Sequence, residues 1–189
     1  DDQTPQDVLP DFLARMQDAG VRRVAVHARK AWLKGLSPKQ NREVPPLDHA
    51  LVVRMAQQFP GLAISINGGI ATLDQAQGFL ATELSGVMIG RAAYHTPAEV
   101  LLDVDSAIFG DDHATPARFD IADAMRPHIA AHLDRGGRLH SVTRHMLGLF
   151  HGQPGARSWR QVLSTGTTAP NAGLEVLDQA LERVAQAQA

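Results

Sequence analysis

Residues 62–75, Leu-Ala-Ile-Ser-Ile-Asn-Gly-Gly-Ile-Ala-Thr-Leu-Asp-Gln, combine a strand pattern, a glycine turn and a helix start. The run at 62–66 is rich in aliphatic and β-branched residues, and Asn67-Gly68-Gly69 follows it directly. Thr72 is typical of a helix N-cap, and Gln75 stands where a capping box needs its partner. A strand that passes into a helix in this way is the repeating unit of a parallel α/β sheet.

Two similar units flank this stretch. A β-rich run at residues 21–26 ends at His27, and another at residues 86–89 ends at Gly90-Arg91. Helical periodicity covers residues 4–20, begins again at Asp48 and at Thr72, and continues from residue 91 to 109. We therefore expect an α/β fold with three parallel strands, in which residues 28–46 form a long basic loop.

A polar break at residues 111–116 separates this region from a purely helical pattern. Helical periodicity is found at about residues 117–134, 138–150, 156–164 and 171–187, with glycine-rich turns between. We therefore expect two domains, 1–110 and 111–189, of which the second is small and all-helical.

Composition excludes several classes of protein. The 189 residues are 44% hydrophobic and 20% charged, which is typical of a globular chain rather than a disordered one. No apolar run approaches the ~18 residues that a membrane helix needs, and no signal peptide is recognisable. The absence of cysteine favours a cytoplasmic protein. The start at Asp1, directly in a helix-opening pattern, suggests a piece of a longer protein.

The net charge of −2 hides a segregation of charge. Two stretches without any acidic residue, 22–42 and 135–174, contain twelve of the 18 basic residues. Such clustering is typical of a surface that binds a polyanion, although two solvated faces would look the same.

The residues that could do chemistry lie where the three β-rich runs end; they are His27, Asn67, Gly68, Gly69, Gly90 and Arg91. Parallel α/β proteins bind ligands at this edge of the sheet, glycines let the backbone approach an anion, and arginine suits phosphate. In a (β/α)8 barrel the loops after the last two strands often form a phosphate site. Each feature has a simpler explanation, since Gly-Gly is often only a turn and a single histidine is often structural. The other histidines have no metal-ligand spacing, so we expect no metal site.

Six segments in order resemble the bacterial tRNA-dihydrouridine synthases, closest to the A subfamily (DusA). They are 27–38 (HARKAWLKGLSP), 41–48 (NREVPPLD), 66–70 (INGGI), 86–94 (GVMIGRAAY), 143–150 (TRHMLGLF) and 154–160 (PGARSWR). The resemblance extends over nearly the whole chain. It implies the C-terminal portion of a (β/α)8 TIM barrel, with about three strands present, followed by a helical domain that binds tRNA.

The resemblance also implies a reaction and a set of site residues. The family uses FMN, with NADPH as reductant, to reduce D-loop uridines of tRNA to dihydrouridine, in the A subfamily at positions 20/20a. His27, Asn67, Gly68, Gly69, Gly90 and Arg91 match FMN-binding positions, and Lys39, Arg42, Arg157 and Arg160 match tRNA-binding positions. The catalytic cysteine of the family lies upstream of Asp1, so this chain contains no catalytic residue and should be inactive alone.

Two other functions fit parts of the sequence. A phosphate-binding barrel isomerase or lyase shares the glycines at the strand ends but has no use for the basic loop. A non-enzymatic RNA-binding module would explain the basic stretches without any flavin. Bound flavin distinguishes the tRNA reductase from both.

Overall fold

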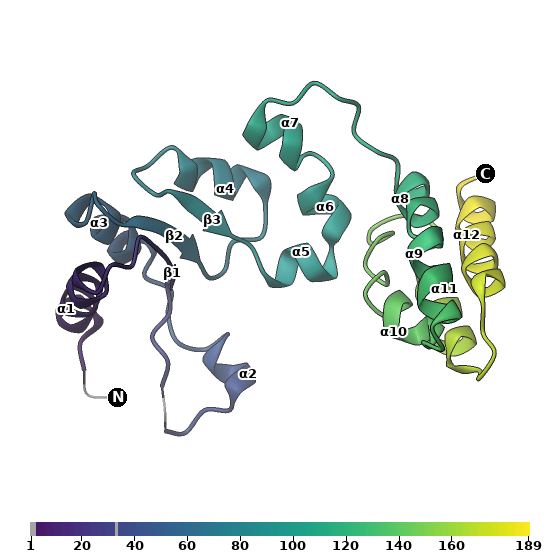
Figure 1. Cartoon of the computed structure of the whole chain (residues 1–189), viewed down its shortest axis with the longest axis horizontal. Coiled ribbons are helices and arrows are strands. Elements are labelled where there is room, and N and C mark those ends of the chain that lie inside the picture. The colour runs from purple at the N-terminus through teal and green to yellow at the C-terminus, as the bar shows by residue number, and fades with distance from the viewer. Residues whose placement is uncertain (1–2, 33) are drawn as a thin grey trace. The chain divides into compact units, whose positions relative to one another are not determined.

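The computed structural model of the chain describes residues 3–32 and 34–189. It divides into two compact units, one up to Gly90 and the other from Arg91 to Ala189 (Figure 1). The first unit is α/β, as the sequence predicts, and the second contains helices and no strand. The predicted domain limits of 1–110 and 111–189 remain a prediction, because a division by contacts does not test where a functional domain begins.

A sheet of three parallel strands, in the order β1-β2-β3, forms the centre of the first unit. The strands are β1 (Arg23–His27), β2 (Ala63–Asn67) and β3 (Gly86–Met88). The helices are α1 (Pro5–Asp18) before β1, α3 (His49–Gln58) between β1 and β2, and α4 (Leu73–Leu80) between β2 and β3. The predicted alternation of strands and helices is therefore confirmed.

Local sequence explains where two of these helices begin. The Asp48 carboxylate accepts a hydrogen bond from the Leu51 amide, 2.9 Å, at the first turn of α3. Thr72 and Gln75 form the predicted capping box of α4. Because each side chain satisfies an amide that has no partner within its helix, the chain leaves the sheet at defined points.

The sheet buries one face against the helices and leaves the other uncovered. Successive strand residues point to opposite faces. The core contains Ile64 and Ile66 of β2 together with α3 residues such as Val52 and Met55, and Val24, Val26 and Val87 pack against it. Of the alternate residues, Ala25, His27 and Met88 are exposed, and those of β2 are half-buried.

The predicted basic loop has internal structure. Arg29 and Leu47 form an antiparallel bridge at its base, and the Asp48 amide donates to the Ala28 carbonyl at 2.7 Å. Inside the loop, Arg29 donates from Nη1 to the carbonyls of Glu43, at 2.8 Å, and Pro45. These contacts close the loop at its base.

A short helix, α2 (Pro38–Asn41), interrupts the same loop. Ser37 and Gln40 form a capping box at its start. The Asn41 side chain accepts from the Trp32 amide and donates to the Trp32 carbonyl, both at 2.7 Å. Residues 37–45 are thus held by local hydrogen bonds, although the sequence predicted only a loop.

The second unit begins with three short helices, α5 (Arg91–His95), α6 (Pro97–Leu101) and α7 (Val104–Phe109). The helices that follow are α8 (Arg118–Ala124), α9 (Arg126–Asp134), α10 (Leu139–Thr143), α11 (Ala156–Thr165) and α12 (Leu174–Gln188), with a 3-10 turn, η1, at Gly166–Thr168. The predicted helix at 117–134 divides at Met125 because Pro127, in the first turn of α9, has no amide hydrogen to continue α8.

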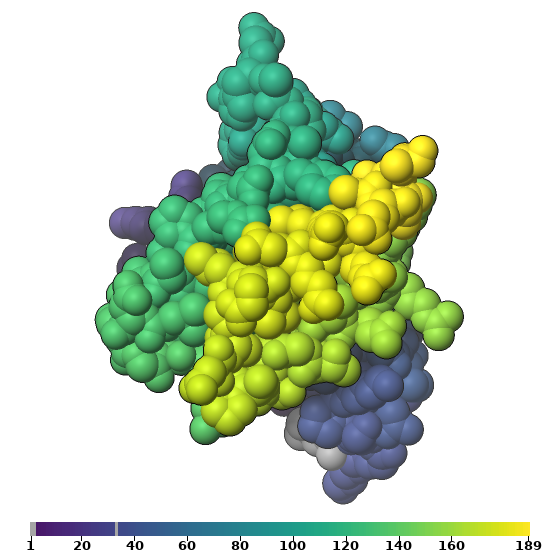
Figure 2. All heavy atoms as spheres, turned by 90° about the vertical axis from the view of Figure 1, so that its right-hand side faces the viewer, coloured from purple at the N-terminus to yellow at the C-terminus, as the bar shows by residue number. Residues whose placement is uncertain are grey.

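Trp159 of α11 occupies the centre of the second core. Its ring is fully buried, lies 4.8 Å from the Phe150 ring centroid, and donates from Nε1 to the Met146 carbonyl at 3.0 Å. Leu177, Ala180 and Val184 of α12 belong to the same core, and Figure 2 shows α11 and α12 side by side. Because Trp159 is fully buried, it is a packing residue and offers no face on which a base could stack.

The prediction of one helix over residues 138–150 is wrong beyond Thr143. The chain winds more tightly there, with hydrogen bonds three residues apart such as the Leu149 amide to the Met146 carbonyl, 3.1 Å. Trp159 shares that carbonyl, and Gly148 lies so close to the His95 carbonyl that a Cβ would collide with it. Contacts distant in sequence therefore override the helical periodicity.

Candidate functional site

The register of the sheet brings His27, Asn67 and Met88 into one row at the carboxyl ends of the strands. His27 pairs with Asn67, and Asn67 pairs with Met88. The three side chains consequently project from the same, uncovered face. The Asn67 side chain donates to the Met88 carbonyl at 2.6 Å, and the Ala28 amide donates to the Asn67 carbonyl at 2.8 Å. His27 and Asn67 thus form the last residues of their strands, adjacent to each other as the sequence predicted.

The Gly68-Gly69 turn follows Asn67 in a conformation that other residues rarely adopt. Gly68 has φ +115° and Gly69 has φ +71°. A Cβ on Gly68 would stand 3.0 Å from the Leu47 side chain and 3.3 Å from the His27 ring, and one on Gly69 would stand 2.5 Å from Leu47. Both backbone conformation and close packing therefore require glycine here.

His49 and Leu47 contact this turn, and the sequence did not identify either as a site residue. His49 Nε2 lies 2.7 Å from the Gly68 carbonyl oxygen, and Leu47 packs against both glycines. The only signal in the sequence was the position of His49 immediately after the predicted N-cap Asp48, which places it in the first turn of α3.

Gly90 and Arg91 follow β3, and the contacts within the chain explain their identities less well than those of Gly68 and Gly69. Gly90 has ordinary backbone angles, and a Cβ added to it would meet no atom within 4 Å. The protein chain itself thus gives no reason for glycine at this position, whereas a ligand close to the backbone would. Arg91 is exposed and begins α5 in the second unit.

Lys39 and Arg42 lie on and just after the one-turn helix α2. They are exposed and three residues apart, so their side chains share a side of the helix. The capping box at Ser37 and the bonds from Asn41 to Trp32 fix the backbone that holds them. The loop therefore presents two positive charges from a preformed turn.

Arg157 and Arg160 form an equivalent pair on α11. Both are exposed and three residues apart, and the intervening Trp159 is buried in the second core. The buried tryptophan fixes the rotation of the helix about its axis. The two guanidinium groups are in consequence directed away from the core.

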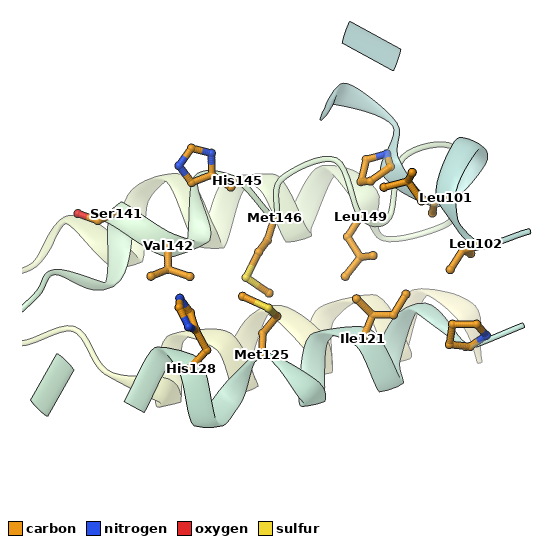
Figure 3. A pocket seen from close by; sticks show the side chains of 13 residues that line it. Leu101, Leu102, Ile121, Met125, His128, Ser141, Val142, His145, Met146 and Leu149 are labelled. Atoms are coloured by element: carbon orange, nitrogen blue, oxygen red, sulfur yellow. The ribbon is translucent and has the colours of Figure 1, made fainter. Parts of the chain in front are cut away.

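A cavity of about 490 Å³ lies within the second unit (Figure 3). Met125 and Ile121 face Met146 and Leu149 across it, and His128 points toward Val142. Its lining is apolar apart from His128, Ser141 and His145 and contains no lysine or arginine, so the cavity has no fixed charge that would hold a phosphate. It is separate from the residues that the sequence predicted for ligand binding.

The described part of the chain offers neither a metal-binding cluster nor a membrane-spanning helix. Over residues 3–32 and 34–189, no group of three or more histidine, aspartate or glutamate side chains is arranged to hold a metal ion. Within the same residues, no helix has both the length and the apolar composition needed to cross a bilayer.

The comparisons with known proteins agree with the resemblance seen in the sequence. The family model described as "Dihydrouridine synthase (Dus)" matches residues 1–186. Proteins named tRNA-dihydrouridine(20/20a) synthase from Xanthomonas campestris, Shewanella oneidensis and Vibrio cholerae are 48%, 47% and 45% identical over 97% of this chain. The matches cover 53%, 54% and 56% of these relatives, so the chain spans about half of their length.

Proposed function

Because the chain belongs to the dihydrouridine synthase family, we propose that it is the FMN-phosphate and tRNA-binding part of a flavin-dependent tRNA-dihydrouridine synthase. The substrate is the uridine at positions 20 and 20a of tRNA, as the names of its relatives state for those proteins. When bound, FMN supplies the reducing equivalents that saturate the uracil double bond, with NADPH as the reductant. The compartment is the cytoplasm, where the tRNA substrate is found.

The observation that supports this proposal best is the row of His27 and Asn67 beside the Gly68-Gly69 turn. These residues lie at the carboxyl edge of a parallel sheet, where α/β proteins bind their ligands. Within the described residues, the Gly69 amide donates to no carbonyl, which leaves it available for an anion. The free space at Gly90 also suits a ligand that approaches the backbone. As the resemblance implies, we assign the FMN phosphate to Asn67, Gly68, Gly69, Gly90 and Arg91, and another part of FMN to His27.

The uncovered face of the sheet supports a partial (β/α)8 barrel. In such a barrel one face of every strand is covered by helices and the other points into the barrel, where side chains from all the strands fill the interior. The exposed face here has small or polar residues such as Ala25 and Ser65, next to Gly86 in the register. Strands that precede residue 1 in the relatives would cover this face, and residues 111–189 would form the helical domain that follows the barrel.

The two basic pairs supply the tRNA contacts. Lys39 and Arg42 are presented by α2, and Arg157 and Arg160 by α11, with one pair in each of the two acid-free stretches. Lysine and arginine in clusters provide the phosphate contacts that position RNA, and they explain why a chain of net charge −2 concentrates its basic residues. A sugar-phosphate enzyme would use the glycine turn but not these pairs.

The proposal is tested by activity with tRNA. The complete product of the gene, incubated with FMN, NADPH and an unmodified tRNA transcript, should form dihydrouridine that mass spectrometry locates at positions 20 and 20a. Residues 1–189 alone should form none, because they contain no cysteine to act as the acid of the reaction.

Three results would contradict the proposal. A complete gene product that purifies without flavin and does not bind added FMN would favour the RNA-binding module. Reduction of tRNA by residues 1–189 alone would show that the catalytic acid lies within this chain. Turnover of a small sugar phosphate, without any effect on tRNA, would favour the isomerase or lyase.

A further inference from the structure

His49, in the first turn of α3, contacts the Gly68-Gly69 turn through one hydrogen bond. Its Nε2 lies 2.7 Å from the Gly68 carbonyl oxygen, and since a carbonyl only accepts, Nε2 is the protonated nitrogen and donates. The edge of the imidazole meets the Phe79 ring at a centroid distance of 5.0 Å and an interplanar angle of 73°. The start of α3 and the side of α4 therefore fix both the position and the orientation of this ring.

This hydrogen bond determines where the next amide points. A trans peptide is planar, so its carbonyl and its amide hydrogen point in opposite directions. With the Gly68 carbonyl directed at His49, the Gly69 amide must point away from α3. Gly69 is exposed, and in the described part of the chain its amide donates to no backbone acceptor. His49 therefore keeps one donor of the turn free on the outer side.

Leu47 also restricts the turn. Its side chain would lie 2.5 Å from a Cβ at Gly69 and 3.0 Å from one at Gly68, so little space remains for the turn to move inward. Leu47 is itself held by its bridge with Arg29, and the neighbouring Asp48 amide donates to the Ala28 carbonyl at 2.7 Å. Leu47, which packs against the Gly68–Gly69 peptide, is thus held by the residues that directly follow β1.

We propose that His49 is a positioning residue that orients the Gly68–Gly69 peptide so that the Gly69 amide can bind a phosphate group. This inference depends on the proposed function, in which that phosphate belongs to FMN. His49 does not touch the ligand and acts only through the carbonyl of Gly68. An amide aimed in advance at the anion binds it more tightly, because no conformational cost is incurred on binding.

Two substitutions separate the hydrogen bond from the packing of the ring. His49→Phe keeps an aromatic ring against Phe79 but cannot donate, whereas His49→Gln retains a donor near the position of Nε2. With FMN and with inorganic phosphate as probes, His49→Phe should bind about tenfold more weakly than the unaltered chain, the factor expected for one ordinary hydrogen bond. His49→Gln should recover most of this loss. His128→Phe, an exposed histidine of the second unit, serves as the control and should have no effect.

The same variants are compared by NMR without any ligand. In His49→Phe the Gly69 amide resonance should shift, because its peptide is no longer held, while the Ile64 and Ile66 amides of the sheet should stay protected from hydrogen exchange. An unchanged Gly69 resonance in His49→Phe would overturn the inference. So would equal binding of phosphate by His49→Phe and by the unaltered chain.

Failure of the proposed function gives a different result. If the unaltered chain binds neither FMN nor phosphate, the anion site itself is wrong, and this holds whatever His49→Phe does to the free Gly69 amide. If the complete gene product is an active, flavin-containing tRNA reductase and His49→Phe leaves its affinity for FMN unchanged, only the role of His49 is wrong.

Discussion

Individual residues at the strand ends show which part of a candidate binding site a sequence can reveal. His27, Asn67 and the two glycines were predictable because they follow β-rich runs, and parallel strands place their carboxyl ends at one edge. His49 was not, because its function depends on a hydrogen bond to a carbonyl nineteen residues away. No sequence pattern tells whether a histidine near the start of a helix only packs against its neighbours or also positions a turn elsewhere in the chain. The assignment of the strand-end residues to FMN stays a prediction.

Gly69→Ala tests the contact between the turn and Leu47. Alanine at φ +71° costs about 1–2 kcal/mol in backbone strain alone, and the overlap with Leu47 should add about 1–3 kcal/mol. We expect a correspondingly lower free energy of unfolding in urea. Gly20→Ala is the matched control, since Gly20 has φ +89° with no atom within 4 Å of a Cβ and should lose only the strain. Equal losses at the two positions would show that Leu47 yields without cost.

At the scale of helices and strands, the sequence predicted helix starts correctly where the capping side chains lie within three residues of the amides they satisfy. The caps at Asp48 and at Thr72 with Gln75 were predicted and are formed, because a helix start needs partners for its first amides. The helix predicted through residue 150 ends instead at Thr143, because Trp159 takes the Met146 carbonyl and Gly148 packs against the backbone of His95. Periodicity contains no information about such distant contacts. The case of α2 is different, since its cap is local but four residues are too few to show a helical period.

The pair of arginines on α11 gives a prediction about RNA binding. Arg157→Gln and Arg160→Gln should each weaken binding of tRNA by the chain and flatten the plot of log affinity against log salt by about 0.7–0.9 units for each phosphate that the variant no longer neutralises. Neither change should affect folding, because both side chains are exposed. Arg183→Gln removes the same charge from an exposed position on α12, outside the acid-free stretches, and should leave the slope unchanged. A slope that falls equally in all three variants would mean that only net charge matters.

At the scale of the whole molecule, the residues that the structure describes form two hydrophobic cores with no residue in common. One is built from residues between Leu9 and Ile89, and the other from residues between Phe119 and Val184. Two ion pairs also join elements of the second core, since Arg126 of α9 lies 2.7 Å from Asp123, from Nε to Oδ1, and 2.6 Å from Asp178, from Nη1 to Oδ1. Hydrogen bonds to Asp123 and Asp178 raise the pKa of Arg126, so this side chain stays charged. Ion pairs this exposed typically add less than about 1 kcal/mol, so apolar packing dominates the stability of each unit.

Because each unit has its own hydrophobic core, we expect the two units to unfold independently of each other. Trp159→Ala removes a fully buried ring and its hydrogen bond to Met146, and should lower the free energy of unfolding of the second unit by about 3–5 kcal/mol. Hydrogen exchange measured by mass spectrometry at increasing urea should then show residues 156–165 losing protection at a lower concentration, with residues 62–70 unchanged. Met55→Ala, in the core of the first unit, should give the opposite result with a loss of about 2–5 kcal/mol. If either variant shifted both segments together, the two units would unfold as one, and the division after Gly90 would have no energetic meaning.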